Sequence, residues 1–211
     1  MENQIDSLKQ SKFQEQNFHK IRIGLDYGFS TPYSGTVDYA SIFGESALGF
    51  AEYSLKKKSY IYSEVIYCAY EMDKGIALMH YYGDWFDIPD SALLISKGKK
   101  TCKSYSYVLG YGFRSKSDYI RPAWRFGAGL IYNYNILDKY TITTPLDTLT
   151  IPKSTSSSIG LNFMFGFDVP ILSDVFGFFS TINISSGIIG SKNSIGMQFT
   201  SATVLGFYFR I

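Results

Sequence analysis

Hydrophobic and polar residues alternate strictly near the end of the chain. From Ser158 to Asp168 the odd-numbered positions carry Ile, Leu and Phe, whereas the even-numbered positions carry Ser, Gly, Asn, Met and Asp. The alternation returns between Ser194 and Ile211. A period of two places successive side chains on opposite faces of a β-strand. Long strands with one large apolar face and one small or polar face are typical of a transmembrane β-barrel.

The same pattern, followed along the whole chain, predicts eight strands. They cover residues 19–30, 47–55, 59–70, 101–113, 120–134, 157–169, 175–188 and 194–211. Long connections, such as 71–100 and 135–156, alternate with short ones, which is typical of long outer loops on one rim and short periplasmic turns on the other. We therefore predict an all-β fold, an eight-stranded antiparallel up-and-down transmembrane barrel over residues 19–211, preceded by a flexible tail over 1–18. A soluble sandwich or lipocalin-like barrel is the alternative, although strands of soluble proteins are usually shorter.

Composition narrows the class of protein further. Charged residues make up 18% of the chain, below the roughly 25% of soluble domains, and aromatic residues also reach 18%. The net charge of +2 and the absence of a basic stripe argue against nucleic-acid binding. No stretch of 18 apolar residues occurs, which excludes a spanning helix. The polar first 16 residues lack the apolar centre of a signal peptide, so an exported barrel with this sequence is expected to be a mature form.

Charged residues with inward parity suggest a network inside the barrel. Seven of them share the small or polar face of the predicted strands: Arg22, Asp26, Glu52, Glu64, Arg125, Asp168 and Arg210. Side chains fill the interior of an eight-stranded barrel, and an unpaired buried charge there costs about several kcal/mol. Three arginines and four acids are therefore expected to form internal salt bridges. The alternative places some of them in water near a rim.

Two cysteines flank the longest predicted loop. Cys68 lies before the 71–100 segment and Cys102 after it, both with inward parity. A disulfide could join the base of the loop, and two free buried thiols are the alternative. The chain contains no CxxC pair, zinc-ligand spacing or phosphate-binding glycine loop. We therefore expect no metal and no cofactor.

An aromatic run in the 71–100 segment is the strongest candidate for a binding surface. Its candidate residues are His80, Tyr81, Tyr82, Trp85 and Phe86. Exposed aromatic side chains are common anchors at interfaces. Alternatively, these rings dip into lipid headgroups or cover the barrel mouth. The combination of His80 with Asp84 and Ser91 would suit a lipid-modifying enzyme. This indication is weaker than that of the aromatic binding surface, and we expect no catalytic site.

The last strand carries a resemblance to a known group of proteins. Apolar residues occupy every second position to the end of the chain, at Leu205, Phe207, Phe209 and Ile211. This resembles the C-terminal assembly signal of bacterial outer-membrane proteins, although the usual final residue is Phe rather than Ile. With eight strands and unequal loops, residues 19–211 resemble the small barrels of the OmpA/OmpX-like superfamily. The resemblance implies the outer membrane of a diderm bacterium, insertion by the barrel assembly machinery, and contact with membrane lipids and lipopolysaccharide.

The sequence leaves several functions open. We expect a non-enzymatic barrel that is an envelope structural protein or an accessory subunit of a secretion or uptake complex, in contact with other outer-membrane proteins. The alternative is an adhesin or ligand-binding barrel that acts through residues 71–100 and 135–156. A wide pore is not expected, since eight strands leave no open lumen.

Overall fold

The alternating segments form long strands in the computed structural model of the chain. The structure describes residues 21–32, 40–56, 58–72, 93–94, 102–115, 121–143, 148–172, 175–190 and 196–211. The long strands are β1 (Ile21–Pro32), β2 (Ala40–Lys56), β3 (Ser59–Met72), β5 (Cys102–Arg114), β6 (Ala123–Leu137), β9 (Ser154–Leu172), β10 (Phe176–Gly190) and β11 (Gly196–Arg210). The short ones are β4 (Leu93–Leu94), β7 (Tyr140–Thr143) and β8 (Thr148–Ile151). Within these described ranges, no helix is long and apolar enough to cross a membrane.

The eight long strands close into a barrel. Each strand pairs antiparallel with the next one along the chain, and β11 returns to pair with β1. Backbone hydrogen bonds complete the closure, because the Ile21 N–H donates to the Ile211 carbonyl at 3.2 Å and the Ile211 N–H donates to the Ile21 carbonyl at 2.9 Å. The predicted up-and-down eight-stranded fold is confirmed.

One face of every described barrel strand points outward and is apolar. Leu25, Leu109 and Leu130 are 72%, 67% and 62% exposed, whereas the residues next to them along the strands face the lumen. In water such a surface would be unfavourable, whereas in a bilayer it faces hydrocarbon. Closure also leaves no unpaired strand edge in the barrel, which a membrane-spanning sheet requires.

Glycines on neighbouring strands make room for the largest rings in the lumen. The ring of Tyr62 lies over Gly110, and the ring of Tyr60 lies over Gly112. In both cases a Cβ on the glycine would overlap the ring. The in-register pairs Tyr62–Gly110 and Tyr60–Gly112 therefore match one large residue with one that has no side chain. This pairing lets an eight-stranded barrel hold tyrosines in a narrow interior.

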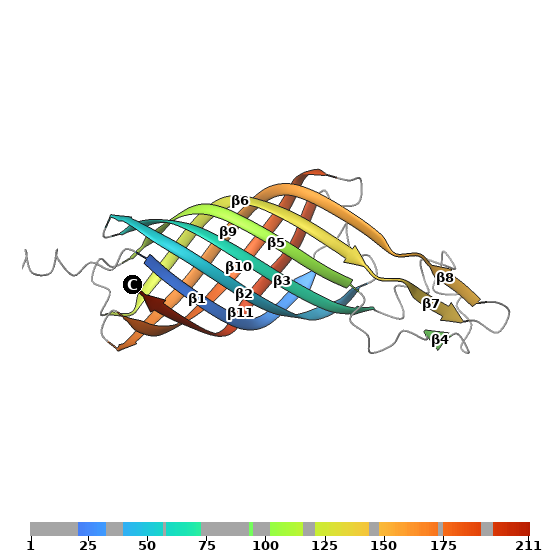
Figure 1. Cartoon of the computed structure of the whole chain (residues 1–211), viewed down its shortest axis with the longest axis horizontal. Helices are drawn as coiled ribbons and strands as arrows, with labels where there is room; N and C mark the ends of the chain where they lie inside the picture. Colours follow the sequence, from blue (N-terminus) through green and yellow to red (C-terminus); the bar gives the residue numbers. More distant parts are fainter. Residues whose placement is uncertain are drawn as a thin grey trace, which may run out of the picture.

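A small second sheet lies beyond one rim. The β6–β9 pairing ends at Leu137 and Ser154, and the β7–β8 hairpin continues in the same direction. Figure 1 shows β7 and β8 projecting past the barrel at the end opposite the C-terminus. Strand β4 adds to β7, with Leu93 opposite Thr143. The two long connections therefore form a three-stranded sheet in the order β4-β7-β8.

The structure corrects two boundaries expected from the sequence. Residues 135–156 are mostly strand rather than loop, because β6 extends to Leu137 and β9 begins at Ser154, with β7 and β8 between them. Strand β2 begins at Ala40 rather than at residue 47. Both differences follow from cross-strand hydrogen bonding, which extends regular structure through segments without a clear apolar face. The predicted tail at 1–18 and most of 71–100 lie outside the described residues.

Candidate functional site

A cluster of ion pairs crosses the lumen near the rim that carries the short turns. Arg22 donates to Glu52 Oε2 at 3.1 Å and to Asp168 Oδ1 at 2.8 Å. Arg114 repeats the arrangement, donating to Glu52 Oε2 at 3.0 Å and to Asp168 Oδ2 at 2.7 Å. Arg125 donates to Asp168 Oδ1 at 3.4 Å and forms a second ion pair with Glu52. Two carboxylates thus bridge three guanidinium groups.

The members of this ionic cluster come from five strands. Arg22 lies on β1, Glu52 on β2, Arg114 on β5, Arg125 on β6 and Asp168 on β9. Each is 5% exposed or less. Removing one partner from such a buried network leaves a charge without compensation, which is strongly destabilising. The ionic cluster therefore links opposite walls of the barrel and occupies the lumen at that level.

Aromatic rings surround the guanidinium groups. The Arg22 guanidinium carbon lies 3.9 Å from the ring centroid of Tyr208 and 4.9 Å from that of Phe50. The Arg125 guanidinium carbon lies 5.3 Å from the Phe50 centroid. Cation–π contacts of this kind are stronger where water is excluded. The rings also fill the space around the ion pairs, so the cluster closes the barrel sterically as well as electrostatically.

The structure brings together four of the seven charged residues expected in the lumen. Arg22, Glu52, Arg125 and Asp168 form the ion pairs described above. Asp26, Glu64 and Arg210 are also buried in the lumen, and Arg210 faces Arg22 in register. Sequence reasoning missed Arg114 by assigning it to a turn. The sequence does contain a signal for it, because Arg114 continues the series of every second residue, Gly110 and Gly112, that faces the lumen.

Above the ionic cluster, small polar side chains share the lumen with buried apolar ones such as Ile66, Val108 and Ile131. Ser106 donates to Asn133 Oδ1 at 2.7 Å, and Asn162 donates to Asn183 Oδ1 at 3.1 Å. Both pairs join residues that face the interior from different strands. No group of three or more His, Cys, Asp or Glu residues suited to a metal ion occurs in the described part of the chain. The lumen therefore offers hydrogen bonding and ion pairing.

Of the two alternatives for the cysteines, a disulfide or free buried thiols, the structure has free thiols. Cys68 and Cys102 are buried free thiols on adjacent strands. The register pairs Cys68 with Ser104 and Cys102 with Tyr70, so the two cysteines are offset by two residues. Such diagonal neighbours have Cα atoms about 7–8 Å apart, beyond the usual span of a disulfide. The prediction treated the loop ends as opposite each other, whereas the strand register shifts them.

The outer sheet is the second candidate site. Thr141 and Thr150 face each other across β7 and β8 with hydroxyl oxygens 3.5 Å apart, and Thr148 is exposed nearby. At its base, the Lys103 ammonium lies 2.6 Å from Asp138 Oδ2. Lys139 and Lys153 are exposed beside this pair. The described part of the sheet thus presents hydroxyl and ammonium groups to the surroundings.

The aromatic binding surface expected from the sequence comprises His80, Tyr81, Tyr82, Trp85 and Phe86. These residues lie outside the described residues. Of the expected assembly signal, Phe207, Phe209 and Ile211 are 41%, 52% and 69% exposed on the outer wall. The side chain of Leu205 is not among those described.

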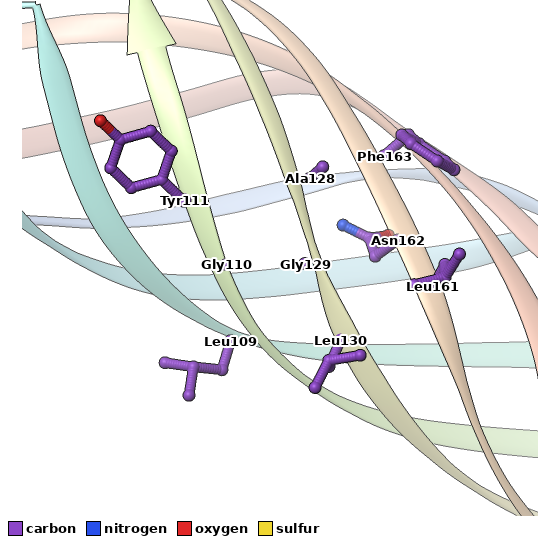
Figure 2. Close-up of a pocket in the computed structure, with 9 residues that line it drawn as sticks. All are labelled: Leu109, Gly110, Tyr111, Ala128, Gly129, Leu130, Leu161, Asn162 and Phe163. Carbon is purple, nitrogen blue, oxygen red and sulfur yellow. The ribbon is translucent and has the colours of Figure 1, made fainter.

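A groove on the outer wall is the third candidate site. It has a volume of about 520 Å³ and crosses β5, β6 and β9. Figure 2 shows the small side chain of Ala128 between Tyr111 and Phe163. Three leucines line the groove as well: Leu109, Leu130 and Leu161. Pockets of about 300–1,000 Å³ are of a size that binds small ligands.

Comparison with solved structures finds the same architecture in small outer-membrane barrels. Neisserial surface protein A is 14% identical, with a TM-score of 0.54 over 90% of this chain and 97% of its own. The attachment invasion locus protein Ail of Yersinia pestis is 9% identical, with a TM-score of 0.51 over 92% of this chain and 100% of its own. No protein-family model and no curated protein matches the sequence. These likenesses confirm the expected eight-stranded barrel fold.

Proposed function

We propose that the protein is a non-enzymatic barrel of the bacterial outer membrane that holds a small β-sheet outside the membrane for contact with another molecule. The observation that carries this proposal is the outer sheet, to which both long connections contribute strands. Hydrogen bonding within β4, β7 and β8 fixes their backbones in one arrangement. A preformed surface loses less conformational entropy on binding than a flexible loop does.

The outer membrane is the location that best suits the barrel. Its outward face is apolar and its ladders close without a free edge, as a bilayer requires of a β-protein. Small barrels with the same fold come from the outer membranes of Neisseria and Yersinia. Direct contacts with phospholipid and lipopolysaccharide, and insertion by the barrel assembly machinery, are part of this proposal.

The ionic cluster supports a structural role for the lumen rather than a catalytic one. Its three guanidinium groups and two carboxylates are engaged with one another, and all are buried. A catalytic group must reach the proton or atom on which it acts. The described interior instead resembles a filled core, which supports assigning function to the outer surface.

The lysines around the outer sheet suggest that a polyanion is the first ligand to test. Lys103, Lys139 and Lys153 lie around its base, with Asp138 as the acidic partner of Lys103. Ail, which shares the fold, has been crystallised with the heparin analogue sucrose octasulfate. Sulfate groups would be attracted to an ammonium cluster, and the interaction would weaken with salt.

The test removes the outer sheet without opening the barrel. Leu137 and Ser154 face each other at the end of the β6–β9 ladder, so an Asn-Gly turn can replace residues 138–153 as a two-residue hairpin loop. Cells that display this variant are compared with wild-type cells for adhesion to immobilised heparin and to epithelial monolayers. The gel mobility of unheated samples reports whether the barrel is folded. We expect the folded variant to lose adhesion.

Exposed lysines provide a matched control for charge alone. The double variant Lys139→Gln, Lys153→Gln keeps the hairpin and removes two ammonium groups. Loss of adhesion in this variant would assign binding to the lysines, and retention would assign it to the rest of the sheet. Full adhesion by the hairpin-deleted barrel would exclude the outer sheet as the binding surface.

A second candidate function is that of an envelope structural protein or an accessory subunit of a secretion or uptake complex. The extensive apolar wall favours it, because a partner barrel could pack there. Purification from native membranes in mild detergent separates the two functions. A protein recovered with it at fixed stoichiometry would support the subunit, and recovery as a lone barrel would favour the surface-binding function.

A further inference from the structure

We propose that the groove around Ala128 binds the end of one acyl chain of a membrane phospholipid. Small residues interrupt the bulky side chains of the outer wall in several places, and this groove is one of them. The exposed outward residues of β6 are Trp124, Phe126, Ala128, Leu130, Tyr132 and Tyr134, and all except Ala128 are large. In register, Ala128 lies between Tyr111 of β5 and Phe163 of β9. A small residue between two rings produces a notch.

Rows of large residues close the notch above and below. Toward the outer sheet, Leu109, Leu130 and Leu161 form one row across the three strands. Toward the short turns, Phe126 faces Phe113 on one side and Phe165 on the other. The groove is therefore a bounded hollow, about two residues long along the strands, rather than a furrow along the whole wall.

The floor is close to the backbone because the outward side chain at its centre is the methyl group of Ala128. Gly110 and Gly129 form an in-register pair next to Ala128, and both line the groove. On the lumen side, the ring of Tyr62 lies against Gly110 and backs the wall there. Strand hydrogen bonds engage its polar backbone atoms. A ligand on this floor gains dispersion contacts, which favour hydrocarbon over a polar molecule.

The depth of the groove identifies its occupant. The exposed apolar residues of β6 run from Trp124 to Tyr134, and those of β9 in the facing rows run from Phe165 to Ile159, so Ala128 lies inside this belt rather than at either end. The groove thus lies near mid-height of the apolar belt, where the acyl chains of the two leaflets end. Its surface is continuous with the lipid-facing wall, so phospholipid chains reach it without displacing any part of the protein.

The width suits a single chain. Tyr111 and Phe163 lie on strands that flank β6, so their Cα atoms are separated by two strand spacings, about 9.5 Å. Their rings take up part of that distance and leave a gap of about one hydrocarbon chain over Ala128. Because these walls belong to one hydrogen-bonded sheet, the groove exists before the lipid binds, and ordering the site costs little.

Site-mapped photocrosslinking tests this proposal. The full-length barrel is reconstituted in phosphatidylethanolamine–phosphatidylglycerol vesicles that contain a phospholipid with a diazirine near the end of one acyl chain. After irradiation, adducts are quantified by peptide. We expect peptides spanning 109–111, 128–130 and 161–163 to carry about fivefold more adduct than the outward residues of β1 and β2, which corresponds to about 1 kcal/mol.

Two matched variants make the result specific. Ala128→Leu fills the groove with an apolar side chain that lipid tolerates, so folding is preserved while adduct formation falls to the level of the surrounding wall. Ala51→Leu enlarges another exposed, outward alanine on β2, away from the groove, and is expected to leave the pattern unchanged. Folding of both variants is checked by the mobility of unheated samples on gels.

The outcomes separate this inference from the proposed membrane location. Even labelling over the outer wall, or an unchanged pattern in Ala128→Leu, would overturn the acyl-chain site while leaving the barrel in its membrane. Crosslinking between two protein chains at these peptides would replace the lipid by a second copy of the barrel. Absence of lipid adducts from the whole wall would instead overturn the membrane assignment.

Discussion

Glu52 is one of the two carboxylates that hold the ionic cluster together. It pairs with Arg22, Arg114 and Arg125 while only 3% exposed. We expect Glu52→Gln to lower the free energy of unfolding by about 3–5 kcal/mol, because it removes one of the two carboxylates that compensate three buried guanidinium groups and leaves these groups to share Asp168. Urea titration of the reconstituted barrel, followed by gel mobility, measures the change.

An exposed glutamate at a strand end provides the control for this substitution. Glu71 lies on β3 with its side chain exposed, and Glu71→Gln should change stability by about 0.5 kcal/mol or less. Equal midpoints for Glu52→Gln and wild type would show that the ion pairs contribute nothing to stability.

Gly112 tests how closely side chains fill the lumen. A Cβ at this position would overlap the buried Tyr60 ring. We expect Gly112→Ala to destabilise the barrel by about 1–3 kcal/mol through overpacking. Combining it with Tyr60→Leu should recover part of the loss, since the coupling of contacting residues appears in a double-mutant cycle.

The matched glycine for this comparison faces outward. At Gly49, a Cβ would approach only the flexible end of Leu25, at 3.3 Å. Gly49→Ala should therefore be close to neutral in the same urea titration. If the two alanine variants lose equal stability, strand entropy rather than lumen packing explains the effect.

At the scale of single strands, two exposed positions of β9 differ in depth. Phe163 lies on the lipid-facing wall near mid-height, whereas Leu172 ends the strand near the short turns, and both are exposed. We expect Phe163→Arg to cost about 2–4 kcal/mol and Leu172→Arg about 0–1 kcal/mol. The difference between their unfolding midpoints in lipid vesicles measures this depth dependence.

One outcome of this measurement would contradict the outward orientation of residue 163. Equal costs for the two arginines would mean that residue 163 does not lie in hydrocarbon. An additional arginine near a rim is tolerated because its long side chain can reach water.

Strands were predictable where both faces carried a signal. In β9 and β11, large apolar residues alternate with small or polar ones, and the predicted strands agree with the structure apart from their ends. Arg114 was missed because sequence alone does not show that β5 continues one residue beyond Phe113. The β7–β8 hairpin was missed because its alternating runs, Tyr140–Thr143 and Thr148–Ile151, are only 4 residues long each and are followed by Pro145 and Pro152. The groove at Ala128 depends on cross-strand register, which only the structure provides.

At the scale of the whole molecule, the ionic cluster predicts the absence of a large pore. Its side chains cross the lumen from five strands, and rings of Phe50, Tyr60 and Tyr208 surround them. An eight-stranded barrel has no width left for an open channel at that level. Planar bilayers containing the purified protein should show no stable large conductance. A steady open channel in wild-type protein would mean that the cluster separates in the membrane.

The contact between β1 and β11 has a kinetic consequence. Every other barrel ladder joins strands that follow one another among the eight, whereas this one brings Ile21 beside Ile211. Pairing two strands that are this far apart in the chain costs loop-closure entropy before any contact offsets that cost. The β1–β11 ladder is therefore expected to form last and slowly. Until then β1 and β11 both have an unpaired edge. The interval before closure is thus the period in which the chain is most exposed to aggregation and most dependent on an assembly factor that shields those edges.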